Sequence, residues 1–125
     1  MKMGPKVVVF TLGEKGCVAM DGRGFYVIPG FEVDVVDTTG AGDVYHGAFI
    51  YGLLQGWDTN KISRFSNAVS AIKCTRLGGR AGIPNADTVN EFLKKQVINY
   101  SEIDARVNYY GMGIYHMCGK QAPTV

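Results

Sequence analysis

The sequence predicts an α/β domain in which short strands are followed by helices. The run Lys6–Thr11 is apolar and β-branched without interruption, which is typical of a strand covered on both faces, as in a parallel sheet. A second β-branched run, Val33–Val36, leads through a glycine-rich loop into a helix-like segment. Beyond it, apolar residues recur at the 3-4-3 spacing of a helix that buries one face, namely Ile62, Phe65, Val69 and Ile72.

The segments before the loop form a strand, a turn and a hairpin in this interpretation. Leu12–Gly16 is a glycine-bounded turn after the first strand. The apolar runs Cys17–Met20 and Phe25–Ile28 flank Asp21–Gly24, and Asp-Gly between two such runs is a strong hairpin signal. We therefore expect a hairpin that ends at Pro29-Gly30, followed by a brief strand at Val33–Val36.

The segments after the loop predict a series of helices. A first helix should run from about Gly42 to Leu54, with Gly56 as its stop. A second should start at a cap formed by Asp58 or Thr59 and end near Leu77, where two glycines follow.

A third helix is expected from about Ala86 to Val97, capped by Asn85 or Asp87. Ser101–Tyr110 is compatible with one more helix. The remaining stretch, Gly111–Val125, is interrupted by glycines, and we expect it to be loosely ordered.

Length and composition bound the classes of protein that need to be considered. The chain has 125 residues, 46% apolar and 19% charged, which suits one ordinary globular domain or part of one. A net charge of +2 is too small to indicate nucleic-acid or anionic-membrane partners. The three cysteines lie far apart and the apolar run near the N-terminus is short. We therefore expect reduced thiols in a cytoplasmic protein, without a zinc site, secretory leader or membrane span.

The loop Asp37–Asp43, with the sequence DTTGAGD, is the strongest functional signal. Gly40 and Gly42 allow positive φ and close approach of the backbone to a ligand. The unpaired amides and the positive dipole end of the following helix favour an anion. Asp43 is a carboxylate inside that field. It either only pairs with the helix dipole or has a chemical role.

Four parts of the sequence together resemble the ribokinase family of carbohydrate kinases, also called the PfkB family. They are the turn Thr11–Gly16, the loop Asp37–Asp43, Asn67, and the segment Thr75–Gly78 with Ile83-Pro84 after it. The resemblance extends from Thr11 to about Leu93 without an obvious gap. It implies a three-layer α/β/α ribokinase-like (Rossmann-like) fold, of which this chain would form the C-terminal, nucleotide-binding portion.

The resemblance also implies roles for individual residues. Asp43 would be the general base for the acceptor hydroxyl, and the N–H groups of Gly40, Ala41 and Gly42 would stabilise the transferred phosphoryl group. Phosphoryl transfer needs such a base, charge stabilisation and positioning. The positions that match contacts to the nucleotide, ATP with Mg²⁺, are Thr11, Leu12, Gly13, Gly16, Gly42 and Asn67. The implied activity is ATP-dependent phosphorylation of a small sugar, or of a nucleoside.

A monovalent-cation site, formed mostly by backbone carbonyls, is implied as well. The matching positions are Asp37, Thr39, Lys73, Arg76, Gly78 and Gly82. Many relatives carry a serine where this chain has Gly82, so the sequence leaves potassium dependence open.

The family's sugar-binding residues, its lid and an acidic motif associated with magnesium lie upstream of the matched segment. We therefore expect this sequence to be the C-terminal half of such a kinase, which need not be active alone. Residues 1–98 would be its nucleotide-binding and catalytic part, and residues 99–125 an extension. Half of a doubly wound sheet exposes a strand edge and an apolar face, so we expect homo-oligomers. The alternative is a non-catalytic nucleotide-binding or oligomerisation module.

Overall fold

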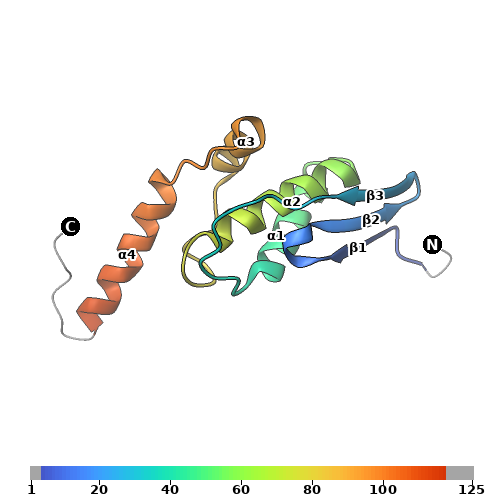
Figure 1. The fold of residues 1–125 in the computed structure, drawn as a ribbon. Coiled ribbons are helices and arrows are strands. Elements are labelled where there is room, and N and C mark those ends of the chain that lie inside the picture. Colours follow the sequence, from blue (N-terminus) through green and yellow to red (C-terminus); the bar gives the residue numbers. More distant parts are fainter. Residues whose placement is uncertain (1–3, 118–125) are drawn as a thin grey trace.

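Three strands precede four helices in the computed structural model, which describes residues 4–117 (Figure 1). The strands are β1 (Val7–Thr11), β2 (Cys17–Asp21) and β3 (Gly24–Ile28), and a short 3-10 turn, η1 (Gly13–Lys15), joins β1 to β2. The helices are α1 (Ala41–Leu54), α2 (Thr59–Cys74), α3 (Ala86–Lys95) and α4 (Ser101–Met117). The sheet and α4 lie toward opposite ends of the molecule, with α1 and α2 between them.

The sheet is antiparallel, with the strand order β1-β2-β3. Val7 lies opposite Asp21 and Thr11 opposite Cys17, so β1 and β2 pair along their whole length. The predicted hairpin is confirmed, but the expected parallel strand covered on both faces is not found among the described residues. An unbroken apolar run indicates apolar surroundings and does not fix the direction of the neighbouring strand.

The two faces of this sheet have different surroundings. Ala19 is 1% exposed and packs in a cluster with Tyr45 of α1. On the opposite face Phe10, Phe25 and Val27 are exposed by 65%, 63% and 69%. The expected uncovered apolar face is therefore confirmed, and within residues 4–117 the helices cover only one side of the sheet.

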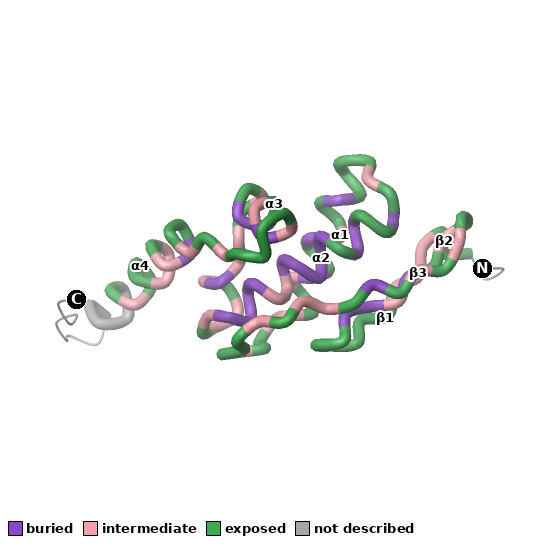
Figure 2. Tube along the Cα trace, turned by 45° about the horizontal axis from the view of Figure 1, so that its top comes forward, coloured by how far each residue is buried: buried purple, intermediate pink, exposed green. Residues whose placement is uncertain are grey.

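The helix α2 forms the centre of the main core. Figure 2 shows long buried stretches along it, and the four apolar residues of its predicted stripe are all buried. Phe65, Val69 and Ile72 pack in one cluster with Val89 and Phe92 of α3 and Ile103 of α4. Asp58 caps α2 as expected, and the helix ends at Cys74, before the glycine pair near which its end was predicted.

The segment Val33–Val36 does not form the predicted strand. The backbone amides of Val36 and Asp37 instead donate to the carbonyl of Cys74 at the end of α2, at 2.8 and 3.1 Å. A strand needs a partner with which to form a ladder, and this extended segment has none among the described residues. It runs alongside α2 and forms one wall of the site described below.

The C-terminal helices differ from the predictions at their ends. α3 stops at Lys95 because Gln96 adopts a left-handed conformation with φ of 57°, and its amide donates to the Phe92 carbonyl. α4 continues past the glycine at 111 to Met117, so the expectation of loose order from Gly111 onward is wrong up to that point. Each of the two glycines in this stretch, at positions 111 and 113, costs the helix only about 1 kcal/mol. Residues 118–125 lie outside the described residues.

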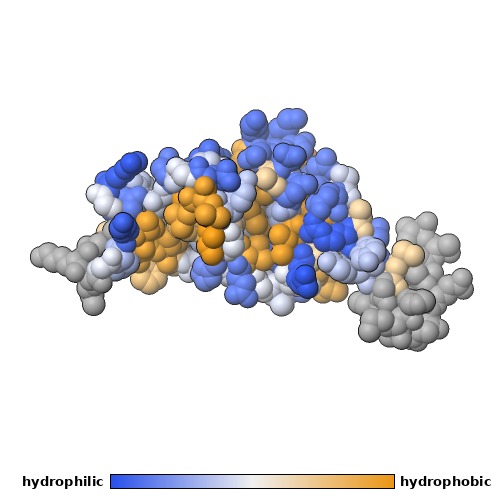
Figure 3. Space-filling view, turned by 180° about the vertical axis from the view of Figure 1, so that it is seen from behind, coloured by the Kyte–Doolittle hydropathy of each residue, from blue (hydrophilic) through white to orange (hydrophobic). Residues whose placement is uncertain are grey.

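Several apolar side chains remain at the surface. α1 is apolar on more than one side, and Ile50, Leu53 and Leu54 are exposed. Figure 3 shows apolar surface across the rear face of the molecule. No helix in the described part of the chain is both long and apolar enough to cross a bilayer. Cys17 and Cys74 are buried and unbridged.

Candidate functional site

The loop Asp37–Asp43 is held in place by its first carboxylate. One oxygen of Asp37 accepts from the amide of Thr39 at 2.9 Å, and the other accepts from the amide of Gly78 at 2.8 Å. These hydrogen bonds, from Thr39 and then from Gly78, lower the pKa of Asp37 to about 2, with a further contribution from the charge of Lys73. Asp37 therefore ties the loop to the segment after α2.

The N-terminus of α1 has no side-chain cap. Gly40 is its N-cap residue and adopts φ of 73°, a conformation that glycine takes without strain. The amide of Ala41 donates to the Thr38 carbonyl at 3.1 Å. No partner is recorded among residues 4–117 for the amides of Gly42 and Asp43, which are two of the four that a helix start leaves open. This end of α1 can therefore bind an anion.

A cavity of about 770 Å³, here called the first cavity, opens beside this helix start. Its walls are the turn after β1, the extended segment 30–35, the start of α1 and one side of α2. Of the predicted nucleotide contacts, it is lined by Thr11, Gly13, Gly16, Gly42 and Asn67, but not by Leu12. The fold thus brings together residues that are far apart in the sequence.

A second cavity of about 710 Å³ lies on the other side of the same helix start. Gly40 and Asp43 line it, whereas Ala41 and Gly42 line the first cavity. The rest of its lining is mostly apolar and comes from α1, α2 and residues 79–86. The start of α1 therefore lies between the two cavities, with Ala41 and Gly42 on one and Gly40 and Asp43 on the other.

Two close contacts shape the turn that borders the first cavity. A Cβ on Gly16 would lie 2.1 Å from the carbonyl oxygen of Ile28, and one on Gly30 would lie 2.2 Å from that of Glu14. Only glycine permits this approach, so the turn packs directly on the end of the hairpin. Asn67 holds the same place, because its side-chain amide donates to the carbonyls of Ile28 and Pro29, both at 3.3 Å.

The residues expected to form the cation site do meet around the end of α2. Lys73 is fully buried, and its Nζ donates to the backbone carbonyl of Asp37 at 2.9 Å. A Cβ on Gly82 would lie 2.7 Å from the carbonyl oxygen of Lys73, so a serine does not fit here without movement. These positions therefore contain an ammonium group beside an expected ligand oxygen and do not fit a monovalent metal ion.

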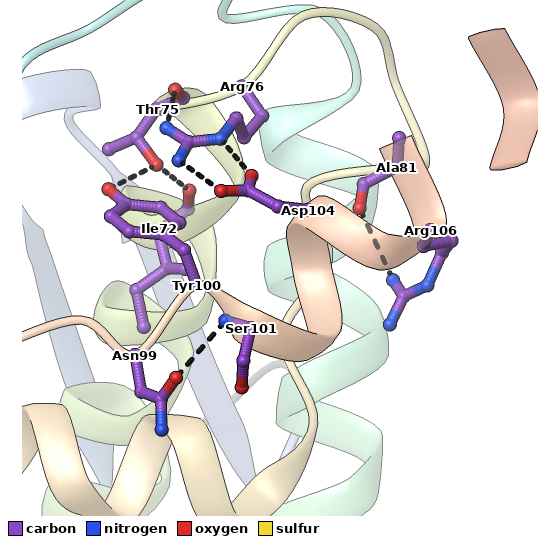
Figure 4. Close-up of polar contacts among 9 residues, drawn as sticks. All are labelled: Ile72, Thr75, Arg76, Ala81, Asn99, Tyr100, Ser101, Asp104 and Arg106. Carbon is purple, nitrogen blue, oxygen red and sulfur yellow. Dashed lines mark hydrogen bonds and ion pairs between the residues drawn. The ribbon is translucent and has the colours of Figure 1, made fainter. Parts of the chain in front are cut away.

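The guanidinium of Arg76 points toward Asp104 of α4 (Figure 4). It pairs with both carboxylate oxygens of Asp104, at 2.7 and 3.2 Å, and its central carbon lies 3.6 Å from the centre of the Tyr100 ring. Tyr100 also donates to Thr75 Oγ1, and Arg106 donates to the carbonyl of Ile83 at 2.6 Å. The start of α4 thus braces the loop between α2 and α3.

Two features of the site, the contact made by Ser70 and the acidic residues that line the first cavity, were not predicted. Ser70 links the two central helices, because its hydroxyl donates to the carbonyl of Ala41 at 3.2 Å. Glu14, Glu32 and Asp34 line the first cavity, and no lysine or arginine does so. Among residues 4–117 no group of three or more His, Cys, Asp or Glu side chains gathers in a way that could hold a metal ion. Spacing in the sequence gave no signal for these features, because they depend on how distant segments pack.

The chain is similar in sequence to known carbohydrate kinases. The model of the family described as "pfkB family carbohydrate kinase" matches residues 1–86. A 5-dehydro-2-deoxygluconokinase from Clostridium perfringens is 35% identical over 105 residues, which is 82% of this chain and 31% of that protein. The chain thus spans about a third of the length of such relatives.

Solved structures agree with the sequence relatives. A ribokinase from Thermotoga maritima superposes with a TM-score of 0.70 at 39% identity, over 75% of this chain and 32% of that one. A putative ribokinase II from E. coli, in complex with ATP and Mg²⁺, superposes with a TM-score of 0.72 at 28% identity, over 75% of this chain and 30% of that one.

Proposed function

Because the chain belongs to the pfkB family of carbohydrate kinases and has the ribokinase-like α/β fold, we propose that it carries the phosphoryl-transfer centre of an ATP-dependent kinase. The acceptor is a hydroxyl of a small sugar, and the alternative acceptor is a hydroxyl of a nucleoside. Residues 1–98 form the nucleotide-binding and catalytic part, and residues 99–125 form an extension.

One observation carries this proposal: the start of α1 separates two cavities. Gly42 lies on the first cavity, and Asp43 lies on the second. A phosphoryl group at this partition meets the open amides of the helix from one side. An acceptor hydroxyl in the second cavity lies next to the carboxylate. Donor and acceptor are thus positioned on opposite sides of the transferred group, as in-line displacement requires.

The amides and the carboxylate act in different ways in this proposal. The amides of Gly40, Gly42 and Asp43 stabilise negative charge on the transferred group. Ala41 contributes less, because its amide already donates to Thr38. The carboxylate of Asp43 takes the proton of the acceptor hydroxyl.

In this proposal ATP with Mg²⁺ binds in the first cavity. Its glycine-rich walls let the backbone approach a ligand, and Thr11 and Asn67 line it with polar groups. The lining carries carboxylates and no lysine or arginine, so the helix start is the protein's main positive element for phosphates. Magnesium supplies charge neutralisation at the phosphates when it is bound with ATP.

The experiment that tests the proposal measures ATP consumption by this chain over a panel of sugars and nucleosides, together with ATP affinity by calorimetry. We expect Asp43→Asn to keep ATP affinity within about twofold, which corresponds to less than about 0.5 kcal/mol. Any acceptor-dependent turnover should be lost in that variant. Unchanged turnover in Asp43→Asn would refute the role of Asp43.

The rival function is a non-catalytic nucleotide-binding or oligomerisation module. Because the chain spans about a third of its relatives, the same assay should include a version extended by the upstream coding sequence, where one exists. ATP binding without turnover by this chain, with turnover by the extended version, supports a kinase. ATP binding without turnover by either supports the module.

Association of copies is a further part of the proposal. Phe10, Phe25 and Val27 on the open sheet face, and Leu54 of α1, are exposed apolar groups that favour burial in an interface. Light scattering at increasing protein concentration tests this, and a monomer at high concentration would count against it.

A further inference from the structure

Lys73 is the largest fully buried side chain in the described part of the molecule. Lysine is rarely buried completely unless its charge has a partner. The hydrogen bond recorded for its ammonium group in residues 4–117 goes to the backbone carbonyl of Asp37. No acidic side chain forms an ion pair with it there, since the salt bridges in that part involve Arg76 and Arg106. The hydrogen-bond partner of this buried cation is therefore a carbonyl oxygen, and the carboxylate of the same residue, Asp37, interacts with it through charge alone.

The surroundings of the ammonium group are rich in backbone carbonyls. Lys73 lies in the last turn of α2, at the negative end of the helix dipole, where the carbonyls of Ile72, Lys73 and Cys74 accept from amides that follow or lie beside the helix. The segment 36–37 docks on the same helix end through the carbonyl of Cys74. Such a place favours a positive charge, and a bound potassium ion would also replace its hydration shell with carbonyl oxygens.

Two features of this chain oppose a metal ion at that place. The Asp37 carbonyl, an expected cation ligand, already accepts from Lys73 at 2.9 Å. At position 82 this chain has a glycine, which offers no side-chain oxygen as a ligand. A Cβ there would lie 2.7 Å from the Lys73 carbonyl oxygen, so a side chain at this position requires the loop to move. A second cation beside the ammonium would also be repelled.

We propose that the ammonium group of Lys73 takes the place of the monovalent cation, so that this protein neither binds nor requires potassium. The charge that stabilises the carbonyls at the end of α2 is supplied by the chain itself. Lys73 is a positioning residue, because it acts through the backbone of Asp37 on the loop that leads to Gly42. The inference deepens the proposed function and rests on it for the catalytic meaning of that loop.

The test measures binding of Rb⁺, a potassium surrogate, by equilibrium dialysis, and the melting temperature in KCl and in NaCl at equal ionic strength. The whole chain is compared with Lys73→Ala, which empties the space, and with Lys73→Met, which fills much of it without charge. Wild type should bind no Rb⁺ and melt at the same temperature in both salts. Lys73→Ala should melt lower in NaCl, bind Rb⁺ stoichiometrically, and regain several degrees in KCl. Lys73→Met should melt lower in both salts and bind no Rb⁺.

Stoichiometric Rb⁺ binding by the wild type, or a melting temperature that rises specifically with K⁺, would overturn the proposal. A Lys73→Ala variant that is folded but neither binds Rb⁺ nor melts higher in KCl than in NaCl would also overturn the proposal. If that variant is unfolded in NaCl, restoration of its fold by KCl supports the proposal, and failure to restore it counts against it. None of these readouts involves ATP. If the kinase proposal is wrong, ATP binding should be absent, while the Rb⁺ binding and the melting temperatures should still follow the pattern given above.

Discussion

The N-terminus of α1 differs from those of α2 and α3 in how its first amides are satisfied. Asp58 accepts from the amide of Lys61 at 2.8 Å at the start of α2, and Asn85 accepts from that of Thr88 at 2.8 Å at the start of α3. α1 begins at Gly40 with no side-chain cap. A cap at this position would stabilise the helix by about 1 kcal/mol but would occupy amides that can bind a ligand.

The uncapped start of α1 shows where this chain leaves helix amides open to a ligand at a cost in helix stability. The capped starts of α2 and α3 are satisfied within the protein, while that of α1 faces the first cavity. Changes at the capped starts, and along α1 beyond its first turn, should therefore affect stability alone.

Gly52 should be the most sensitive glycine of α1. A Cβ there would lie 2.8 Å from Cγ1 of the buried Ile62, so Gly52→Ala overpacks the contact between α1 and α2. Overpacking costs about 1–3 kcal/mol and exceeds the gain of about 1 kcal/mol in helix propensity. We expect urea denaturation to show a loss of about 1–2 kcal/mol in unfolding free energy.

The two side-chain caps should come next. Asp58→Ala and Asn85→Ala should each lower the unfolding free energy by about 1 kcal/mol, because each leaves one helix amide without its acceptor. Neither should change ATP affinity. A loss of ATP binding in either variant would remove the distinction between capped starts and the open start of α1.

Asp37 should contribute a pH-dependent part of the stability. Because its folded pKa is lowered from 3.8 to about 2, its contribution is fully present above about pH 4 and is lost as the pH falls toward 2. Asp37→Asn should remove this dependence. Urea midpoints of the two proteins should therefore differ at pH 6 and converge as the pH falls to about 2. A constant difference between them over this range would show that Asp37 does not link its loop to Gly78 in this way.

Much of this fold could be predicted where local chemistry decides the structure. Asp-Gly between apolar runs was enough for the β2–β3 hairpin, and the caps Asp58 and Asn85 were among the candidates. The glycines of the loop Asp37–Asp43 predicted a turn with positive φ before a helix, and Gly40 has φ of 73° at the start of α1. In each case a few neighbouring residues determine the backbone conformation.

The rest depended on contacts between distant segments. Val33–Val36 has strand composition, but it pairs with the end of α2 because no strand partner lies beside it. Gln96 ends α3 in a left-handed conformation that a non-glycine sequence does not signal. Lys73 was predicted for its carbonyl oxygen, whereas its side chain is the group that reaches Asp37. Burial of a side chain is not readable from the residue alone.

One pair of variants tests the central claim, that the start of α1 binds the transferred phosphate. Gly42 and Gly47 both lie in α1, and a Cβ on either meets no atom within 4 Å. Each alanine variant should therefore be at least as stable as the wild type, by up to about 1 kcal/mol. Only Gly42 lines the first cavity.

Calorimetry with Mg²⁺ and ATP on the wild type and these two variants is the most direct measurement. We expect Gly42→Ala to weaken ATP binding by about tenfold or more, equivalent to about 1.4 kcal/mol. The added methyl group should block the unpaired amides at the start of α1. Gly47→Ala should bind ATP as the wild type does. Equal ATP affinity in all three proteins would contradict the claim that the start of α1 is the phosphate site.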